Sequence, residues 1–251
     1  MARPRVPSTT VSSLAAARPA RARLGRWPYD DQVAHLVLLD QQMVPTSTDI
    51  ASWIAEATQR GARTVRTGAI FPDAAAPLLD AGFHVADTLT LLALHVRDRT
   101  SSSNQRRART SGTVRLRRLR PAMLAEAAEI DRRAFSAPWA NDTSALADIM
   151  TATPHHRSRS MHLDGRMVAF SISGRADRSG YVQRLAVDPS ARRRGFANVL
   201  LDDALHWMRR RDVEQAMVNT AFDNRAALAL YESVGFDQRP DSLLILEQAL
   251  R

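Results

Sequence analysis

The sequence predicts a mixed α/β fold, in which helices flank one sheet that contains both parallel and antiparallel strands. The main observation is the order of apolar patterns over residues 113–251: strand, two helices, three strands, helix, strand, helix, strand. A second observation is the pair of strand patterns at 159–163 and 167–173, joined by the turn dipeptide Asp164-Gly165. This expected antiparallel hairpin argues against a doubly wound, wholly parallel sheet.

Composition divides the 251 residues into four segments. Residues 1–26 carry six arginines, no acidic residue and few large apolar side chains, so we expect a disordered Arg/Ala-rich tail. A transit peptide has a similar composition and stays open as an alternative for this segment. Residues 97–112 are polar and charged without apolar periodicity, which predicts a linker. The remaining segments, a smaller one at 27–96 and a larger one at 113–251, are the expected folded units.

Charge and cysteine content restrict the classes of function. All 35 basic residues are arginine, the net charge is +9, and the chain has no cysteine. The lack of cysteine excludes disulfides, thiolate metal sites and a cysteine nucleophile, and it fits a cytoplasmic protein. No stretch reaches the roughly 18 apolar residues that a membrane helix needs, so we expect no membrane partner. Much of the positive charge lies in the tail and the linker, without aromatic residues to stack on bases, so we do not expect nucleic acid binding.

Each element of the larger unit follows from a local pattern. Val114, Leu116 and Leu119 alternate with arginines in a strand that stops at Pro121. Apolar residues with helical spacing predict helices at 124–131, 144–150, 195–211 and 224–234. Runs with strand character predict the remaining strands at 159–163, 167–173, 181–187, 216–220 and 243–246.

A weak internal repeat relates the two units. Trp53, Thr67 and Phe83 of the smaller unit resemble three residues of the larger one, Trp207, Thr220 and Phe236. The intervals 67–83 and 220–236 both span sixteen positions. Two interpretations stay open: the match is chance, because Gly-Phe commonly follows a helix, or the smaller unit is a truncated second copy of the same fold.

The segment 185–201 has the pattern of a phosphate-binding turn. A strand ends at Asp188-Pro189, a loop with three arginines follows, and a helix opens at Gly195. Free N–H groups at the start of a helix bind phosphate well, and Gly195 and the small Ala197 let the backbone approach the oxygen atoms. The alternative is a solvated arginine turn before an ordinary helix.

Two polar residues on the next helix have both a structural and a chemical interpretation. Asn224 is placed to cap this helix, and its amide could also reach a ligand between the strands. Tyr231 follows two turns later on the same face, where it is either a core residue or a proton donor. A phenol with a pKa of about 10 is suited to protonating a leaving thiolate of similar basicity.

The order Leu185-Ala186-Val187-Asp188-Pro189, Arg192-x-x-Gly195-x-Ala197, Asn224 and Tyr231 before Gly235-Phe236 resembles the GNAT superfamily of acetyl-CoA-dependent N-acetyltransferases. The resemblance covers 113–251 and implies a mostly antiparallel sheet splayed around the acyl-CoA. It implies that acetyl-CoA is the acyl donor and that the backbone of Leu185, Ala186 and Val187 pairs with its pantetheine arm. It further implies a pyrophosphate site on Arg192, Arg193, Arg194, Gly195, Phe196, Ala197 and Asn198. By the same resemblance, Asn224 contacts the pantetheine and Tyr231 is the catalytic general acid.

Two details bear on the acceptor. Ala134-Phe135 with Pro138-Trp139 resembles the acetyltransferases that modify protein N-termini, but Asn219 stands where those enzymes commonly have an acidic residue. The smaller unit resembles a degenerate GNAT half, because Phe71 and Leu78 fall where Asn224 and Tyr231 would be. The whole chain is thus expected to be a tandem GNAT protein with one competent copy.

The expected reaction is direct attack of an amine on the thioester. Strand 181–187 contains no carboxylate, so the remaining candidates for the base are Glu126, Glu129, Asp131, His155 and His156. The alternative for each of them is an ordinary surface residue. The two histidines are expected in a polar loop and lack a third ligand, so no metal site is expected. The favoured acceptor is a small-molecule amine or an amino acid. The alternatives are a protein N-terminus of the ribosomal-protein type and a non-enzymatic acyl-CoA-binding regulatory module, and we expect a monomer or a homodimer.

Overall fold

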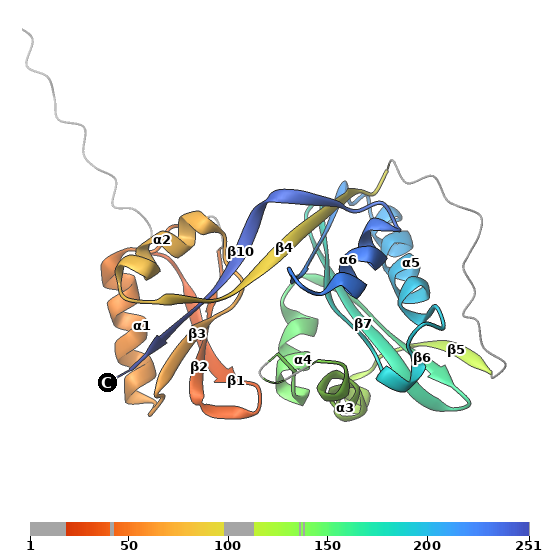
Figure 1. Cartoon of the computed structure of the whole chain (residues 1–251), viewed down its shortest axis with the longest axis horizontal. Helices are drawn as coiled ribbons and strands as arrows, with labels where there is room; N and C mark the ends of the chain where they lie inside the picture. The colour runs from red at the N-terminus through yellow and green to blue at the C-terminus, as the bar shows by residue number, and fades with distance from the viewer. Residues whose placement is uncertain (1–18, 41–42, 98–112, 136, 138, 251) are drawn as a thin grey trace, which may run out of the picture.

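Figure 1 shows the computed structural model of the chain, which describes residues 19–40, 43–97, 113–135, 137 and 139–250. Ten strands form one sheet in the order β1-β2-β3-β10-β4-β9-β8-β7-β6-β5. The first five strands are β1 (Ala22–Trp27), β2 (Asp30–Leu38), β3 (Thr64–Thr67), β4 (His84–His95) and β5 (Val114–Arg118). The others are β6 (His155–Leu163), β7 (Arg166–Ala176), β8 (Ser179–Val187), β9 (Gln215–Ala221) and β10 (Asp237–Ala249). The pairs β2/β3 and β8/β9 are parallel and the others antiparallel, which confirms the predicted mixed sheet.

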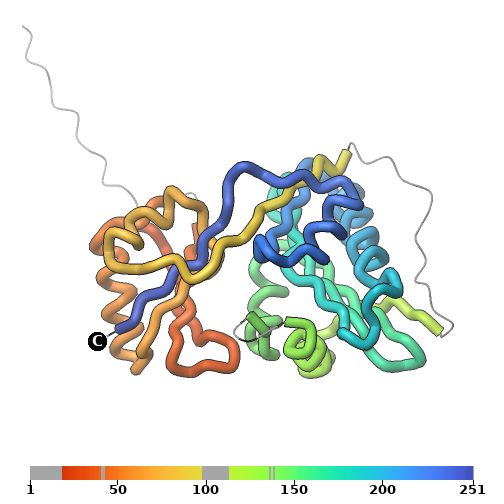
Figure 2. The backbone as a smooth tube through the Cα atoms, viewed as in Figure 1, coloured from red at the N-terminus to blue at the C-terminus, as the bar shows by residue number. Residues whose placement is uncertain are grey.

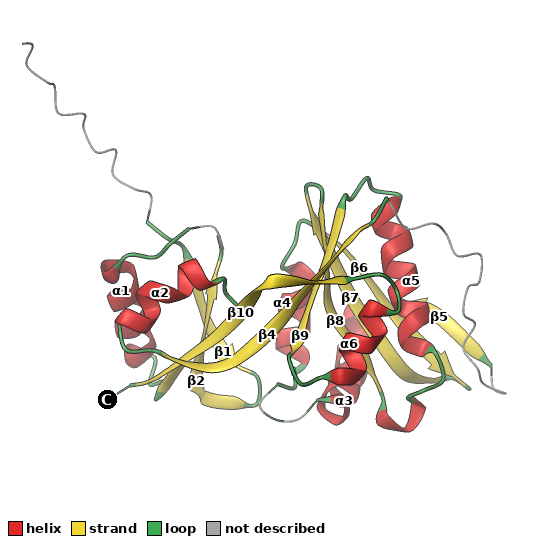
Figure 3. Cartoon of the chain, turned by 45° about the horizontal axis from the view of Figure 1, so that its top comes forward, coloured by secondary structure: helices red, strands yellow, loops and turns green. Residues whose placement is uncertain are grey.

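Helices cover both faces of the sheet in the C-terminal half (Figure 3). The helices are α1 (Ser47–Gln59), α2 (Pro72–Asp80), α3 (Leu124–Ala134), α4 (Thr143–Thr151), α5 (Phe196–Arg209) and α6 (Arg225–Glu232). Helices α5 and α6 share one apolar cluster with β8 and β9, whereas α3 and α4 pack with β7 in another. The order of elements predicted for the larger unit is confirmed from β5 to β10.

The same succession of elements occurs twice along the chain. A strand, a helix, a second strand parallel to the first, a helix and a last strand form β2-α1-β3-α2-β4 and again β8-α5-β9-α6-β10. The last strands of the two series, β4 and β10, are antiparallel to each other. Trp53 and Trp207 lie on the first helix of each series, and Thr67 and Thr220 lie on the strand that follows. The arrangement therefore supports the second-copy interpretation of the repeat.

The last strands of the two series are exchanged between the halves. Strand β4 leaves the N-terminal half and pairs through Leu89–His95 with β9, and β10 returns to pair through Glu247–Ala249 with β3. Between these ends β4 and β10 pair with each other. Figure 2 shows the two segments running side by side across the molecule. The larger unit therefore does not complete its own sheet, because β4 from the smaller one lies between β9 and β10.

Three expectations from the sequence differ from the structure. Residues 22–26 of the expected tail belong to β1, because pairing with β2 and contact with α1 stabilise a segment whose own pattern is weak. His155 and His156 begin β6 instead of lying in a loop, because they pair with Arg175 and Gly174 of β7. Strand β10 has 13 residues, Asp237–Ala249, whereas the sequence predicts a strand only at 243–246. The expected disorder of 1–18 and the linker 98–112 lie outside the described residues. In the described part of the chain, no helix is long and apolar enough to cross a membrane.

Candidate functional site

The two parallel strands of the C-terminal half separate part-way along their length. Strands β8 and β9 pair only through Ser179–Tyr181 and Gln215–Met217. Beyond that point, the described residues provide no partner strand for Val182–Val187 on the side of β9. On its other side β8 stays paired with β7 up to Val187. The free edge at Leu185, Ala186 and Val187 can therefore accept an extended ligand as an added strand.

A β-bulge lies where the strands begin to separate. Ile172 of β7 opposes Arg184, and Ser173 opposes Val182, so Gln183 is the extra residue. A bulge bends its strand and increases the local twist. It therefore helps to turn β8 away from β9 at this point. The bulge and the separation together produce the splay that the resemblance implied.

The loop before α5 presents its backbone toward the end of the splayed strands. Gly195 has a φ of +85° and Arg193 a φ of +63°, so the chain turns through two left-handed residues before the helix. Among the described residues, none accepts a backbone hydrogen bond from the N–H groups of Arg193, Arg194 or Gly195. The first N–H groups of the helix, at Phe196, Ala197 and Asn198, lack intrahelical partners as at any helix start. This arrangement of N–H donors suits a pyrophosphate.

The three arginines of the loop have different roles. Arg192 donates a hydrogen bond of 2.9 Å to the carbonyl oxygen of Ala134 and so ties the loop to the end of α3. Arg193 and Arg194 have exposed side chains. Asp188 at the start of the loop pairs with Arg133 at 2.8 Å, which fixes the loop to α3 a second time.

Asn224 and Tyr231 lie on α6, next to the splayed strands. The Asn224 side-chain oxygen accepts a hydrogen bond of 3.2 Å from the N–H of Ala227, so the expected cap is present and its NH₂ group faces away from that bond. Tyr231 is 6% exposed and packs edge-on against Phe236, with ring centroids 5.8 Å apart. Burial raises the pKa of Tyr231 to about 12, although the nearby positive charge of Arg184 acts to lower it. The phenol therefore keeps its proton throughout the neutral range, as an acid must.

Asp131 and Arg184 form the central polar contact on the opposite face of β8. The Asp131 carboxylate is fully buried and accepts two hydrogen bonds from the Arg184 guanidinium, at 2.7 and 2.6 Å. The same guanidinium donates to the Trp139 carbonyl oxygen at 2.9 Å and stacks 3.5 Å from the Phe135 ring centroid. Arg184 directly follows the bulged Gln183. The pair thus fastens the loop after α3 to the strand that bends around the splay.

Side chains from the N-terminal half hold this loop from its other side. Arg66 of β3 lies with its guanidinium carbon 4.6 Å from the Trp27 ring centroid and 5.8 Å from that of Trp139. Its Nε donates to Glu247 of β10 at 2.6 Å. The Trp27 and Trp139 rings meet edge-on at 5.9 Å. Sequence reasoning missed Trp27, Arg66 and Arg184, because no local pattern marks contacts between such distant segments.

The candidate bases are not gathered at the splay. Asp131 is engaged by Arg184, and Glu126 accepts a hydrogen bond of 3.2 Å from the N–H of Met167. Glu129 pairs with Arg132 on the surface. His155 and His156 lie at the start of β6, near the C-terminal end of α5, whereas the phosphate-binding loop lies at its N-terminal end. Asn219 is exposed on β9, on the face opposite Val218, which packs under α5.

The corresponding place in the N-terminal half is closed. Strand β3 pairs with β2 along its whole length, from Thr64 to Thr67. The helix that follows β2 begins with a capping box between Thr46 and Asp49, whose side chains already bond its first N–H groups. Leu78 is fully buried in the core at the place that corresponds to Tyr231.

Comparison with known proteins identifies the family. The model of the acetyltransferase (GNAT) family matches residues 124–236. The chain is 30% identical over 115 residues to the [ribosomal protein bS18]-alanine N-acetyltransferase of Escherichia coli K12, which covers 46% of this chain and 75% of that protein. The chain is a GNAT acetyltransferase.

One further protein is similar in sequence to part of this chain, and one solved structure is similar in fold. Human N-alpha-acetyltransferase 30 is 39% identical over 59 residues, which is 24% of this chain and 16% of that protein. A tandem GNAT protein from the clavulanic acid biosynthesis pathway shares the fold, with a TM-score of 0.63 and 15% identity over 91% of this chain and 78% of that one. By its family, the GNAT chain is an N-acetyltransferase that uses acetyl-CoA as its acyl donor.

Proposed function

We propose that this GNAT chain acetylates a small primary amine or an amino acid, with acetyl-CoA bound in the splay between β8 and β9. The observation that carries this proposal is the contact of the β1/β2 hairpin with the loop after α3. In this proposal, that loop and the face of β8 that carries Arg184 form the acceptor side. The N-terminal half contacts it through Trp27 and Arg66, which leaves less room for a long peptide than a free loop would.

Further contacts of the β1/β2 hairpin also support a restricted acceptor side. The Tyr29 hydroxyl donates to the Asn141 carbonyl oxygen at 3.3 Å, and Arg26 pairs with Asp142 at the start of α4. Arg23 pairs with Asp148 of α4 at 3.0 Å. Exposed ion pairs of this kind add little free energy each, about 0–1 kcal/mol. Together with the Trp27–Trp139 contact, however, they define one position of the hairpin over the loop.

The geometry of the splay supports the following roles for the donor side. The backbone of Leu185, Ala186 and Val187 would pair with the pantetheine amides, and the N–H groups from Arg193 to Asn198 would bind the pyrophosphate. The Asn224 amide would donate to the pantetheine arm. Tyr231 would protonate the departing thiolate, since its high pKa keeps the proton available. A strand N–H beside the bulge would stabilise the oxyanion. In this proposal the N-terminal half is a degenerate copy that holds no acyl-CoA.

A peptide N-terminus is the second candidate acceptor. It is favoured by the 30% identity to the bS18-alanine N-acetyltransferase and by the segment from Ala134 to Trp139. The exposed Asn219 weighs against it, because an amide cannot take the proton of an ammonium group.

The test is thiol release from acetyl-CoA with two matched acceptor panels. One panel holds free amino acids and small amines, and the other holds hexapeptides with the same first residues. We expect larger kcat/KM values for the free acceptors than for the peptides. Larger values for the hexapeptides would favour the second candidate. Tight CoA binding without turnover on either panel would overturn both.

A further inference from the structure

One end of the C-terminal half gathers arginines and histidines around a tryptophan. Arg118 ends β5, Arg157 lies on β6, Arg175 lies near the end of β7, and Arg210 and Arg211 follow the last turn of α5. Trp207 of α5 lies among them. We call these six residues the arginine face. No local sequence pattern groups them, because they come from four separate elements.

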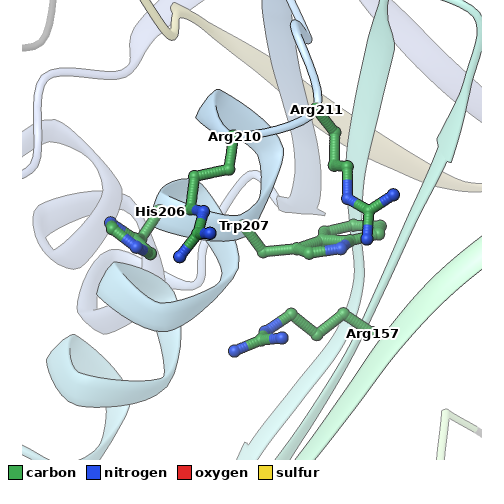
Figure 4. Close-up of a pocket in the computed structure, with 5 residues that line it drawn as sticks. All are labelled: Arg157, His206, Trp207, Arg210 and Arg211. Atoms are coloured by element: carbon green, nitrogen blue, oxygen red, sulfur yellow. The ribbon is translucent and has the colours of Figure 1, made fainter.

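Two adjoining pockets open on the arginine face. The first, of about 350 Å³, is lined by Arg157, His206, Trp207, Arg210 and Arg211. The second, of about 280 Å³, is lined by Arg118, Pro154, His155, His156, Arg175, Trp207 and Arg211. Figure 4 shows the indole of Trp207 between the side chains of Arg157 and Arg211. The half-buried indole thus belongs to both pockets, and no carboxylate lines either one.

Only part of this charge is neutralised within the protein. Asp203 of α5 binds Arg157 through two hydrogen bonds of 2.6 and 2.8 Å. Among the described residues, no carboxylate forms an ion pair with Arg118, Arg175, Arg210 or Arg211. The Nε of Arg175 is buried and has no hydrogen-bond partner there. The C-terminal end of α5 contributes about half a negative charge, which is small beside four arginines.

The arginine face is distinct from the acetyl-CoA site. The proposed pyrophosphate loop lies before Phe196, and the arginine face lies at the other end of the same 14-residue helix. At 1.5 Å per residue the two are about 21 Å apart. This end of the sheet continues to Arg97 and Arg178, which line a further pocket at the starts of β8 and β9 and the end of β4. Arg178 there pairs with Glu214 at 2.9 Å, so among the described residues Arg97 adds the uncompensated charge of this pocket. Six neighbouring strands at about 4.8 Å spacing make this strip about 24 Å long.

We propose that the arginine face binds single-stranded nucleic acid, contrary to the expectation from the sequence, because these arginines lie on a folded surface beside an aromatic ring. Uncompensated arginines can bind successive phosphates through paired N–H donors, and the Trp207 indole offers a surface on which a base can stack. An acidic protein segment would use the arginines but would have no need of an aromatic ring. The elongated strip suits a chain with several phosphates better than one small anion. RNA and DNA share this chemistry, and the experiment separates them.

The test is fluorescence anisotropy of labelled oligouridylate and oligodeoxythymidylate 12-mers with the full chain, over a series of salt concentrations. We expect binding whose constant falls with salt at about −0.7 in log–log slope for each phosphate neutralised. Arg118→Ser with Arg211→Ser should weaken binding about tenfold and reduce the slope by about 1.4. Trp207→Leu should weaken binding about tenfold with the slope unchanged, because stacking releases no counterion.

The matched control removes two exposed arginines from elsewhere, Arg63→Ser with Arg239→Ser. This control lowers the net charge equally and should retain wild-type affinity. Equal loss in both double variants would assign the binding to overall charge and overturn the proposal. Unchanged binding by Arg118→Ser/Arg211→Ser would do the same. Displacement of the oligonucleotide by polyglutamate, with no effect of Trp207→Leu, would identify a surface for acidic proteins instead. CoA affinity measured on the same samples should stay unchanged, so this outcome is independent of the proposed acetylation.

Discussion

Arg184 holds the fully buried carboxylate of Asp131 through two hydrogen bonds of 2.7 and 2.6 Å. This pair connects α3 with the strand that bends around the splay. Replacing Asp131 by Asn leaves a largely buried guanidinium without its counter-charge. We expect the free energy of unfolding to fall by about 3–5 kcal/mol in urea titration. Glu129→Gln, which removes the exposed pair with Arg132, should cost at most about 1 kcal/mol. Equal losses in the two variants would contradict a special role for the buried pair.

Tyr231→Phe should lower turnover by at least about a hundredfold while leaving CoA affinity intact, because only the proton donor is lost. The measurement is steady-state thiol release together with CoA binding by calorimetry. Burial raises the pKa of Tyr231 to about 12, so deprotonation of this phenol should not reduce the wild-type rate below about pH 10. Unchanged turnover in the variant would remove Tyr231 from the mechanism.

Gly195→Val should abolish CoA binding, since a β-branched residue is strained at a φ of +85° and would crowd the pyrophosphate loop. Gly61→Val is the matched control, because Gly61 has a φ of +79° and a Cβ there would meet no atom within 4 Å. Both variants should lose similar stability in thermal unfolding. Retained CoA affinity in Gly195→Val would disprove the pyrophosphate assignment.

His35 should make the stability of the chain dependent on pH. Burial lowers its pKa from 6.5 to about 4, and its ring lies edge-on 4.9 Å from Trp27. The unfolded chain therefore takes up this proton first as the pH falls. Neutral His35 makes its full contribution to the free energy of unfolding above about pH 6.5. This contribution, up to about 3 kcal/mol, is lost as the pH falls from about 6.5 to about 4. Denaturation at several pH values should show a shallower dependence in His35→Gln; the same slope in both proteins would refute the prediction.

Asn219→Glu tests the acceptor side. A carboxylate on the exposed face of β9 can accept the proton of an ammonium group, so we expect kcat/KM for peptide acceptors to rise about tenfold near pH 7. Asn219→Gln, which has the same length but no charge, should show no such gain. A gain in both variants, or in neither, would count against a missing base at this position.

Local patterns predicted the donor side of the site. Gly195 and Asn224 stand at helix starts, where their chemistry depends on a few neighbouring residues. The relation between Asp131 and Arg184 could not be predicted in this way, because 53 positions separate them. Strand β10 was predicted too short, since the polar segment around Arg239 and Pro240 hides a strand held by pairing with β4. The contact of Trp27 with Trp139 depends on how the two halves pack against each other. Local sequence patterns carry no information about this packing.

The exchange of β4 and β10 limits which deletions this chain can tolerate. A fragment that begins at residue 113 would lack β4, and its β9 would present an open row of N–H and C=O groups to any other chain. A fragment that ends before β10 would leave β3 in the same condition. Neither half can therefore be lost by a simple deletion, even though the N-terminal half shows no splay of its own. The exchanged strands make each half a structural scaffold for the other, independent of any ligand that it binds.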